Sequence, residues 1–399
     1  MEDTTQTNAR PPETWLPAVL FGGMIAASVF SVSIMGFSLT GWAWVAGLLA
    51  GAALFLKKGT TLVVLPFQYW LPWAVMVLLY VGWGFEHAVQ SALQILCPLM
   101  VGMAVSTLRP AEAEAETFLK WCRMGAMLFL GVMVFVRLPM LLLGRLPETT
   151  GLAPQAMTAM LFQSLFLCSW LLRRDKTDLL LYLGCAVFVI VSLVRGAMLG
   201  SLALVVLTLA PLSFARRVMI AVAAVVIGWM VFQMPTVQKK MFWSGRGGIE
   251  DLRWDNPDLR KHTRDLMWNR LWSGVQERPW LGHGGNASAT DLVEAGFGDL
   301  PHNDWLRILF NYGIVGCALY VLAMLVQILH GWRWAESAPL HTRVLLHGGL
   351  SAFVPYAVVM FFDNILIYAT FYGNLHFLLL GFAYGSLAAE VEKEPITET

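Results

Sequence analysis

The sequence predicts an all-α polytopic membrane protein with about twelve transmembrane helices and one large loop that contains short helices. Of its 399 residues, 57% are hydrophobic and only 13% are charged, and the mean hydropathy is +0.63. Apolar runs recur along the chain, and about 20 such residues form a helix that crosses ~30 Å of hydrocarbon. Membrane barrels would instead alternate polar and apolar residues in blocks of about ten. The composition excludes a soluble enzyme, and the net charge of +1 indicates no general attraction to nucleic acid.

Twelve apolar runs are expected to form the helices, and one long hydrophilic segment interrupts them. They divide the chain into a tail at 1–14, nine helices within 15–234, a loop at 235–303, three helices within 304–390 and a tail at 391–399. The first residues lack a basic region followed by a cleavage site, so we expect no removable signal peptide. The predicted spans are 15–35, 38–56, 62–84, 88–107, 117–136, 154–172, 178–194, 197–214, 217–234, 304–329, 343–362 and 373–390.

Basic residues lie in every connection that follows an even-numbered span, which is typical of cytoplasmic loops. They are Lys57, Lys58, Arg109, Arg173, Arg174, Arg216, Arg217, Arg333, Arg343 and Lys393. Both termini are therefore predicted in the cytoplasm and the loop at 235–303 outside it. The loop has nine Lys and Arg of its own, but long translocated segments largely escape the rule. Arg195, the loop and His302 are thus predicted on one extracytoplasmic face.

The long loop is predicted to contain a helix over about 258–277. Four apolar residues recur there at helical spacing, namely Trp268, Leu271, Trp272 and Val275. Continuing this stripe backward in steps of four reaches Arg264 and then Arg260. An arginine on the inward face of a helix needs a partner, because burying an unpaired charge is costly. That partner is either a loop carboxylate such as Asp255 or Asp258, the membrane surface, or a ligand.

Two further residues on the same predicted face are candidates for binding or catalysis. Arg195 lies at the turn between two spans, where it either anchors the helices in the headgroups or has a functional role. His302 precedes a membrane helix, and Asn303 or Asp304 is expected to cap that helix. An imidazole has an ordinary pKa near 6.5, which suits a general base at ambient pH.

No metal site and no cofactor are expected. His262, His283 and His302 match no zinc spacing, and the chain has no Asp-x-Asp pair of the kind that holds metal in many glycosyltransferases. The five cysteines all fall inside apolar runs and are expected to act as packing residues. They are Cys97, Cys122, Cys168, Cys185 and Cys317.

Three blocks of the sequence resemble the O-antigen ligase/polymerase superfamily of membrane glycosyltransferases. The first is SLVRGAMLG at 192–200, and the second is RDLMW at 264–268 followed by ERPWLGHG at 277–284. The third is PHN at 301–303 followed by YGIVG at 312–316. Ser192 lies three residues before Arg195 rather than beside it, which departs from the family pattern and argues against a role for this serine.

The resemblance implies a GT-C-like enzyme in the bacterial inner membrane, with its active site facing the periplasm. Members transfer a glycan from undecaprenyl diphosphate to an acceptor hydroxyl, without metal and with inversion. Arg195 and Arg264 would bind the diphosphate and His302 would be the catalytic base. Asn303, Asp304 and Arg260 would support them.

Three functions are compatible with the sequence. An O-antigen ligase, whose acceptor is the lipid A core, is the favoured reading, and a polymerase that joins lipid-linked repeat units is the alternative within the family. A polysaccharide or lipid-glycan transporter is the alternative of another class. Many transporters have related halves and polar sites at the bilayer midplane. Here no halves are visible, and the candidate charges lie at the membrane surface. Lys120 and Arg123, the charges nearest to an intramembrane position, lie near the cytoplasmic end of their span.

Overall fold

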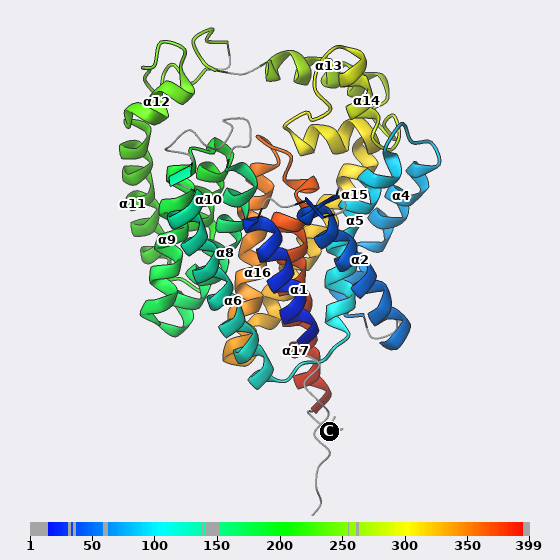
Figure 1. Cartoon of the computed structure of the whole chain (residues 1–399), viewed down its shortest axis with the longest axis vertical. Helices are drawn as coiled ribbons and strands as arrows, with labels where there is room; N and C mark the ends of the chain where they lie inside the picture. Colours follow the sequence, from blue (N-terminus) through cyan, green and yellow to red (C-terminus); the bar gives the residue numbers. More distant parts are fainter. Residues whose placement is uncertain are drawn as a thin grey trace, which may run out of the picture.

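The protein is almost entirely helical (Figure 1). The structure, a computed structural model, describes residues 15–30, 33–34, 37–58, 63–137, 139–140, 152–253, 255–260 and 263–393. A short antiparallel hairpin, β1 (Ser33–Ile34) and β2 (Phe37–Ser38), pairs Ser33 with Ser38 and Ile34 with Phe37. The predicted N-terminal tail and most of the C-terminal tail lie outside the described residues, as does His262.

The helices follow the chain in three groups. Before the long loop lie α1 (Trp15–Val29), α2 (Leu39–Lys58), α3 (Leu65–Gln68), α4 (Leu71–Val81), α5 (Ala88–Ser106), α6 (Glu112–Val132), η2 (Met133–Arg137), α8 (Ala153–Arg173), α9 (Lys176–Ser192), α10 (Arg195–Leu207) and α11 (Phe214–Phe232). The loop contains α12 (Pro235–Met241), α13 (Arg264–Glu277) and α14 (Ala287–Glu294). After it come α15 (Asp304–Ala335), α16 (Leu340–Val359), η4 (Ile365–Ile367), η5 (Ala369–Gly373) and α17 (Asn374–Lys393).

Seven helices of the described residues are long and apolar enough to cross a membrane. They cover Leu39–Lys57, Ala88–Ser106, Glu112–Arg137, Ala153–Arg173, Phe214–Phe232, Asp304–Ala335 and Leu340–Val359. Three shorter apolar helices occupy Trp15–Val29, Leu65–Val81 and Arg195–Leu207. Helices α9 and α17 coincide with the two remaining predicted spans. The chain is therefore an all-α, multi-pass protein, while its division into twelve spans stays a prediction.

Several helix ends differ from the predicted spans, and prolines account for two of these differences. The span predicted over 62–84 is divided because Pro72 in the first turn of α4 starts a new helix. Helix α15 continues beyond 329 to Ala335, and α16 begins directly after Pro339. Helix α1 is shorter than predicted and ends at Val29, before the β-hairpin. A helix can continue past the hydrocarbon, so hydropathy alone does not show its end.

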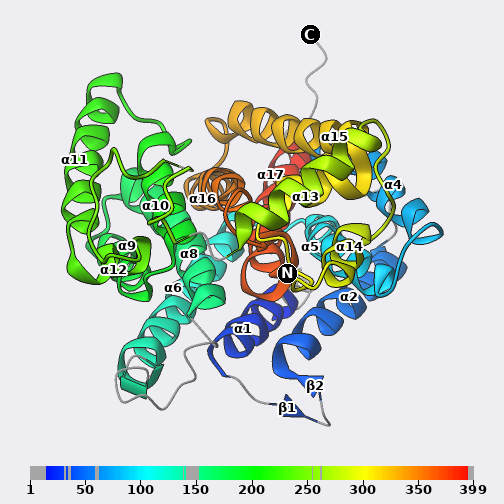
Figure 2. The same ribbon diagram turned by 90° about the horizontal axis from the view of Figure 1, so that it is seen from above.

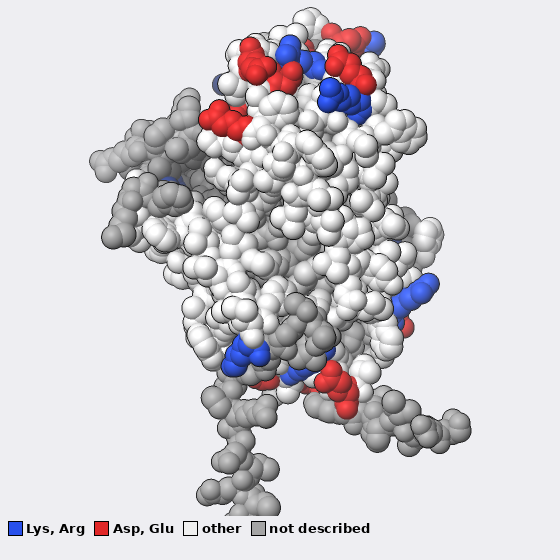
Figure 3. All heavy atoms as spheres, turned by 90° about the vertical axis from the view of Figure 1, so that its right-hand side faces the viewer, with Lys and Arg blue, Asp and Glu red and all other residues white. Residues whose placement is uncertain are grey.

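The most buried helices lie in the middle of the molecule. Seen from above, α16 and α17 are central, and α11 lies at the periphery (Figure 2). Helix α17 packs against α5, and α16 packs against α8 and α10. The four cysteines Cys97, Cys122, Cys168 and Cys185 are buried and unpaired, and Cys317 is half-buried. On the face drawn in Figure 3, charged side chains gather at the two ends, and uncharged side chains cover the band between them. This distribution is typical of a protein that spans a bilayer.

Helices α12, α13 and α14 lie at one end of the helix bundle, which we call the loop end, with α12 beside α11 and with α13 and α14 beside α15 (Figure 1). The end with the start of α6 and the end of α17 is called the opposite end. Helix α13 buries Met267, Leu271 and Val275 against α14 and the start of α15. Trp272, predicted on this apolar stripe, is instead 51% exposed. Leu271 and Val275 are buried as predicted and Trp268 packs against the same cluster, so only Trp272 departs from the predicted stripe, and Met267 takes its place.

Helix α15 is interrupted at Gly313, and the loop docks onto this break. Gly313 has φ 66° and ψ −170°, and a Cβ there would lie 2.3 Å from the carbonyl oxygen of Trp280, so only glycine fits. Phe310 O and Asn311 O accept hydrogen bonds from the backbone amides of His283 and Gly284. The backbone N–H groups of Ile314 and Val315 donate to Pro279 O and Trp280 O. The segment 279–284 thus satisfies the backbone groups that the interruption frees.

Candidate active site at the loop end

The turn after α16 holds His302 in place. His302 has φ 51°, a conformation uncommon for a residue other than glycine. Its backbone N–H donates to Asn364 Oδ1 at 2.9 Å. Its side chain is 35% exposed, whereas that of the neighbouring Asp363 is only 12% exposed. The imidazole is therefore accessible to a substrate, and the carboxylate behind it is shielded.

Two groups lie beside the same ring nitrogen of His302. Nδ1 is 3.3 Å from Asp363 Oδ1 and 3.0 Å from Asn364 Nδ2. Nδ1 can accept a hydrogen bond from the Asn364 amide, with the proton on Nε2, or it can donate to Asp363, which leaves Nε2 unprotonated. Only the second tautomer allows Nε2 to accept a proton. An imidazolium formed in this way would have Asp363 as its counter-ion.

Asn303 and Asp304 connect the histidine to the helix and to the turn. Asn303 is the N-cap of α15, and its Oδ1 accepts a hydrogen bond from the backbone N–H of Leu306 at 3.0 Å. The fully buried Asp304 accepts one from Leu366 N–H at 2.7 Å, and its own N–H donates to Met360 O. One of the two expected caps is thus Asn303, and both side chains hold the backbone around His302.

Arg264 reaches the same turn from the loop. It is the first residue of α13, and its Nη1 donates to Phe362 O at 2.9 Å. Burial lowers the pKa of Arg264 from its ordinary value, and the negative charge of Asp363 opposes this shift. The loop carboxylates predicted as partners have other contacts, because Asp255 pairs with Arg253 and Asp258 accepts from Ser244.

Arg195 approaches the turn from α10. Its Nη1 donates to Arg260 O at 3.0 Å, and the next residue, Gly196, lies against Phe362. Arg195 faces the positive charges of Arg264 and Arg260. The structure therefore brings together the three predicted residues Arg195, Arg264 and His302, although they come from three separate parts of the chain.

Arg260 does not lie on the loop helix. The helix predicted over 258–277 begins only at Arg264, because Thr263 has a left-handed φ of 63°. Arg260 lies before it, where its backbone N–H donates to Met241 O and its guanidinium stacks on Trp243 at 4.4 Å. Extending an apolar stripe backward was therefore wrong for Arg260, although this residue still contacts Arg195 through its carbonyl group.

No cation at this site forms an ion pair with a carboxylate of the described residues, although the charge of Asp363 acts on Arg264 and that of Asp258 acts on Arg260. Among the residues that the structure describes, no ion pair joins Arg195, Arg260 or Arg264 to an acidic side chain. A fourth cation, Lys240 of α12, also lies near them. Its pKa is lowered because its amino group is partly withdrawn from water and faces the positive charge of Arg195. The site thus concentrates positive charge in a setting that would favour a bound anion.

The sequence pattern did not assign roles to Asp363, Asn364 or Tyr368. In the sequence, Asp363 is only an acidic residue directly after the predicted span 343–362. Asn364 and Tyr368 belong to no motif. The pKa of Tyr368 is raised by burial and by the negative charge of the nearby Asp363, with which its hydroxyl also interacts. These residues join the site because the turn after α16 folds back against His302.

The described residues contain no cluster of three or more His, Cys, Asp or Glu side chains that could hold a metal ion. His283, one of the histidines considered as a metal ligand, stacks on Phe310 with ring centroids 4.4 Å apart, and its Nε2 lies 2.7 Å from Gly274 O. Its side chain therefore packs the loop against α15.

Comparison with known proteins agrees with the sequence blocks. Residues 180–321 match the model of a family described as O-antigen ligase. No curated protein matches the chain. The matched segment runs from α9 into α15 and contains Arg195, Arg264 and His302. The resemblance drawn from the motifs is thereby confirmed, and this segment belongs to the O-antigen ligase-like superfamily.

Proposed function

We propose that the protein is an O-antigen ligase, which transfers a glycan from undecaprenyl diphosphate to a hydroxyl of the lipid A core. In this proposal it lies in the bacterial inner membrane, with both termini in the cytoplasm and the loop end in the periplasm. The observation that carries the proposal is a group of arginines that form no ion pair among the described residues, beside a histidine that lies next to the carboxylate of Asp363. The family match supports a glycosyltransferase that uses lipid-linked glycans.

Arg195 and Arg264 would bind the diphosphate of the donor. Guanidinium groups stay charged and bind phosphate oxygens bidentately, so they stabilise the negative charge that develops on the leaving group. Among the described residues each arginine donates one hydrogen bond to a backbone carbonyl, Arg195 to Arg260 O and Arg264 to Phe362 O. These bonds would orient the guanidinium groups and leave their other N–H groups for the donor. Arg260 and Lys240 would add positive charge around them.

His302 would activate the acceptor. Its Nε2 takes the proton of the acceptor hydroxyl as the oxygen attacks the anomeric carbon of the donor sugar. The bond between that carbon and the phosphate oxygen breaks, and its electron pair leaves with the diphosphate. Attack from the side opposite the leaving group inverts the anomeric centre. Asp363 would hold the productive tautomer and stabilise the imidazolium, with Asn303 and Asp304 fixing the backbone.

The direct experiment offers the purified protein a lipid-linked glycan, with and without lipid A core. Glycan joined to the core, and no product without it, is the result expected of the ligase. Lengthened lipid-linked chains would instead show a polymerase. Failure to consume the lipid-linked glycan under both conditions would contradict enzymatic transfer and favour the transporter.

Replacing His302 by alanine should lower the rate of transfer by about 10²- to 10⁴-fold, because a positioned base contributes about that much. The midpoint of thermal unfolding in detergent should change little, since the imidazole is partly exposed. His341→Ala is the matched control, because His341 also lies beside a carboxylate, Glu112, but at the opposite end. Near-normal transfer by His302→Ala would rule out the histidine as the base.

A further inference from the structure

A large cavity lies beside the candidate site, between the start of α2, the end of α4, the start of α5 and the η4–η5 segment. Its volume is about 710 Å³, within the range of about 300–1,000 Å³ that is typical of small-molecule sites. None of the proposed diphosphate ligands lines it. The cavity is therefore a separate space that the donor diphosphate would not occupy.

Tyr368 connects this cavity to the candidate site. It lines the cavity next to Ile367, whose backbone N–H donates to Asn364 O at 3.3 Å, and Asn364 Nδ2 lies 3.0 Å from His302 Nδ1. The positive charge of Arg264 also acts on Tyr368. A molecule in the cavity would therefore meet His302 from the side of Tyr368, while the donor diphosphate would lie at the arginines.

The cavity wall is polar but almost uncharged. Gln90 and Gln94, four residues apart on α5, line it together with Thr370. Neither glutamine amide has a hydrogen-bond partner among the residues that the structure describes, so both remain able to donate and to accept. Among the described residues, no Lys, Arg, Asp or Glu lines the cavity, and His87 is the one histidine that does. Such a wall suits a ligand rich in hydroxyl groups rather than a second diphosphate.

Aromatic side chains complete the wall. Trp44, Phe85 and Phe371 line the cavity besides Tyr368. Aromatic rings offer flat apolar surfaces, and the C–H faces of a sugar ring can pack against them while its hydroxyl groups reach the amides. The combination of free amides, a hydroxyl and several aromatic rings therefore matches the two kinds of surface that a sugar presents.

We propose that this cavity binds the sugar of the acceptor and places its hydroxyl beside His302. The inference rests on the proposed function and deepens it, because it assigns the acceptor a site of its own. Gln90 and Gln94 recognise the sugar hydroxyls, the aromatic rings pack against the sugar, and Tyr368 separates the acceptor site from the donor site. Acceptor specificity would then depend on α2, α4 and α5, outside the segment that matches the family model.

The test is a binding measurement that needs no turnover. Purified protein is titrated with two lipid-free sugars, the core oligosaccharide of lipopolysaccharide and a repeat-unit oligosaccharide, and their Kd values are measured by calorimetry. The double variant Gln90→Leu/Gln94→Leu should bind the preferred sugar at least about tenfold more weakly, because two amide contacts are lost. Gln233→Leu, an exposed glutamine at the end of α11, is the matched control and should bind normally.

Each outcome bears on the cavity directly. Weaker sugar binding by the double variant, together with normal binding by the control, supports the acceptor site. Unchanged binding by the double variant overturns the acceptor site, and so does binding of neither sugar by the natural protein. If the leucine variant binds a lipid more tightly than the natural protein does, the cavity is a hydrocarbon site instead. If the natural protein binds sugar but does not transfer glycan, the proposed function fails while the binding result still stands.

Discussion

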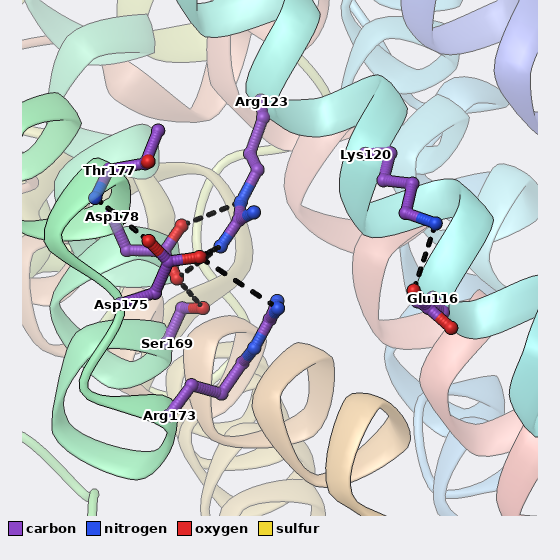
Figure 4. A network of polar contacts seen from close by, with 8 residues as sticks. All are labelled: Glu116, Lys120, Arg123, Ser169, Arg173, Asp175, Thr177 and Asp178. Atoms are coloured by element: carbon purple, nitrogen blue, oxygen red, sulfur yellow. Dashed lines mark hydrogen bonds and ion pairs between the residues drawn. The ribbon is translucent and has the colours of Figure 1, made fainter.

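The arginine side chains at the two ends of the molecule have different hydrogen-bond partners. At the opposite end, Arg123 of α6 donates to both oxygens of the fully buried Asp178 and to Asp175, at 2.5 to 2.8 Å, and Ser169 also donates to Asp178 (Figure 4). At the loop end, Arg195 and Arg264 donate only to backbone carbonyl groups among the described residues. Asp175 and Arg195 flank α9, and the 17 residues of this helix separate the ion pairs of Arg123 from the loop-end arginines by about 25 Å.

This difference separates structural from candidate functional arginines. A buried arginine with two carboxylates is neutralised by the protein itself, and its role is complete when the chain folds. At the loop end the positive charges of Arg264 and Arg260 act on Arg195, and a bound anion would relieve this repulsion. The same residue type should therefore affect stability at one end and transfer at the other.

The largest expected effect is on stability at the opposite end. Arg123→Met should lower the free energy of unfolding by about 3–5 kcal/mol, because it leaves the buried Asp178 without its charge partner. Chemical unfolding in detergent measures the change. The control Lys120→Met removes an exposed pair with Glu116 and should cost less than about 1 kcal/mol. Similar losses for both variants would remove the contrast, and Arg123→Met/Asp178→Leu should recover part of the stability.

The second effect is on transfer at the loop end. Arg195→Met and Arg264→Met should each lower the turnover rate by about 10²- to 10³-fold, as does loss of one charge-stabilising donor in other enzymes. The stability of Arg195→Met should be unchanged or slightly higher, because repulsion from Arg264 and Arg260 is removed, and that of Arg264→Met should change little, because an attraction to Asp363 is lost as well. Initial rates with saturating donor measure the effect, and Arg278→Met, at the exposed end of α13, is the control. A large loss of stability with normal turnover would make these arginines structural.

The third effect concerns the carboxylate beside His302. Asp363→Asn should lower kcat by about 10- to 100-fold, which is less than complete loss of the base, because the imidazolium loses its counter-ion. The KM values for donor and acceptor should stay within about twofold, since Asp363 is shielded and would not contact either substrate. Steady-state kinetics separate the two parameters. Raised KM values with an unchanged kcat would show that Asp363 shapes a binding surface instead.

The smallest effect is expected from the outermost cation. Lys240→Met should weaken donor binding by about two- to fivefold, since an exposed charge contributes about 1 kcal/mol or less. The loss should shrink at high salt, because screening already weakens this interaction. Donor titrations at two ionic strengths measure it, with the neighbouring exposed Lys239→Met as the control. Equal effects from both lysines would indicate a general surface charge rather than a place in the site.

Motifs and local chemistry could be predicted more reliably than geometry. Arg195 and His302 were recognisable because each is a polar residue at the end of an apolar run, Arg264 because it continues the stripe of the predicted loop helix, and Asn303 because it has the chemistry of a helix cap. The start of α13 was misplaced, because the left-handed backbone of Thr263 and the docking of the preceding segment depend on contacts with α12. Asp363 and Tyr368 could not be assigned, since they join the site only through the fold of the turn after α16.

The amino-acid sequence by itself determined the all-α membrane class, the family blocks and the polar residues of one end, because hydropathy and motif spacing are local properties of the chain. The tertiary structure decided which charges are neutralised. It gave Arg123 two carboxylates, left Arg195 and Arg264 with none among the described residues, and placed Asp363 beside His302. Charge pairing depends on distance in space rather than on distance along the chain, so no pattern of residues could reveal it.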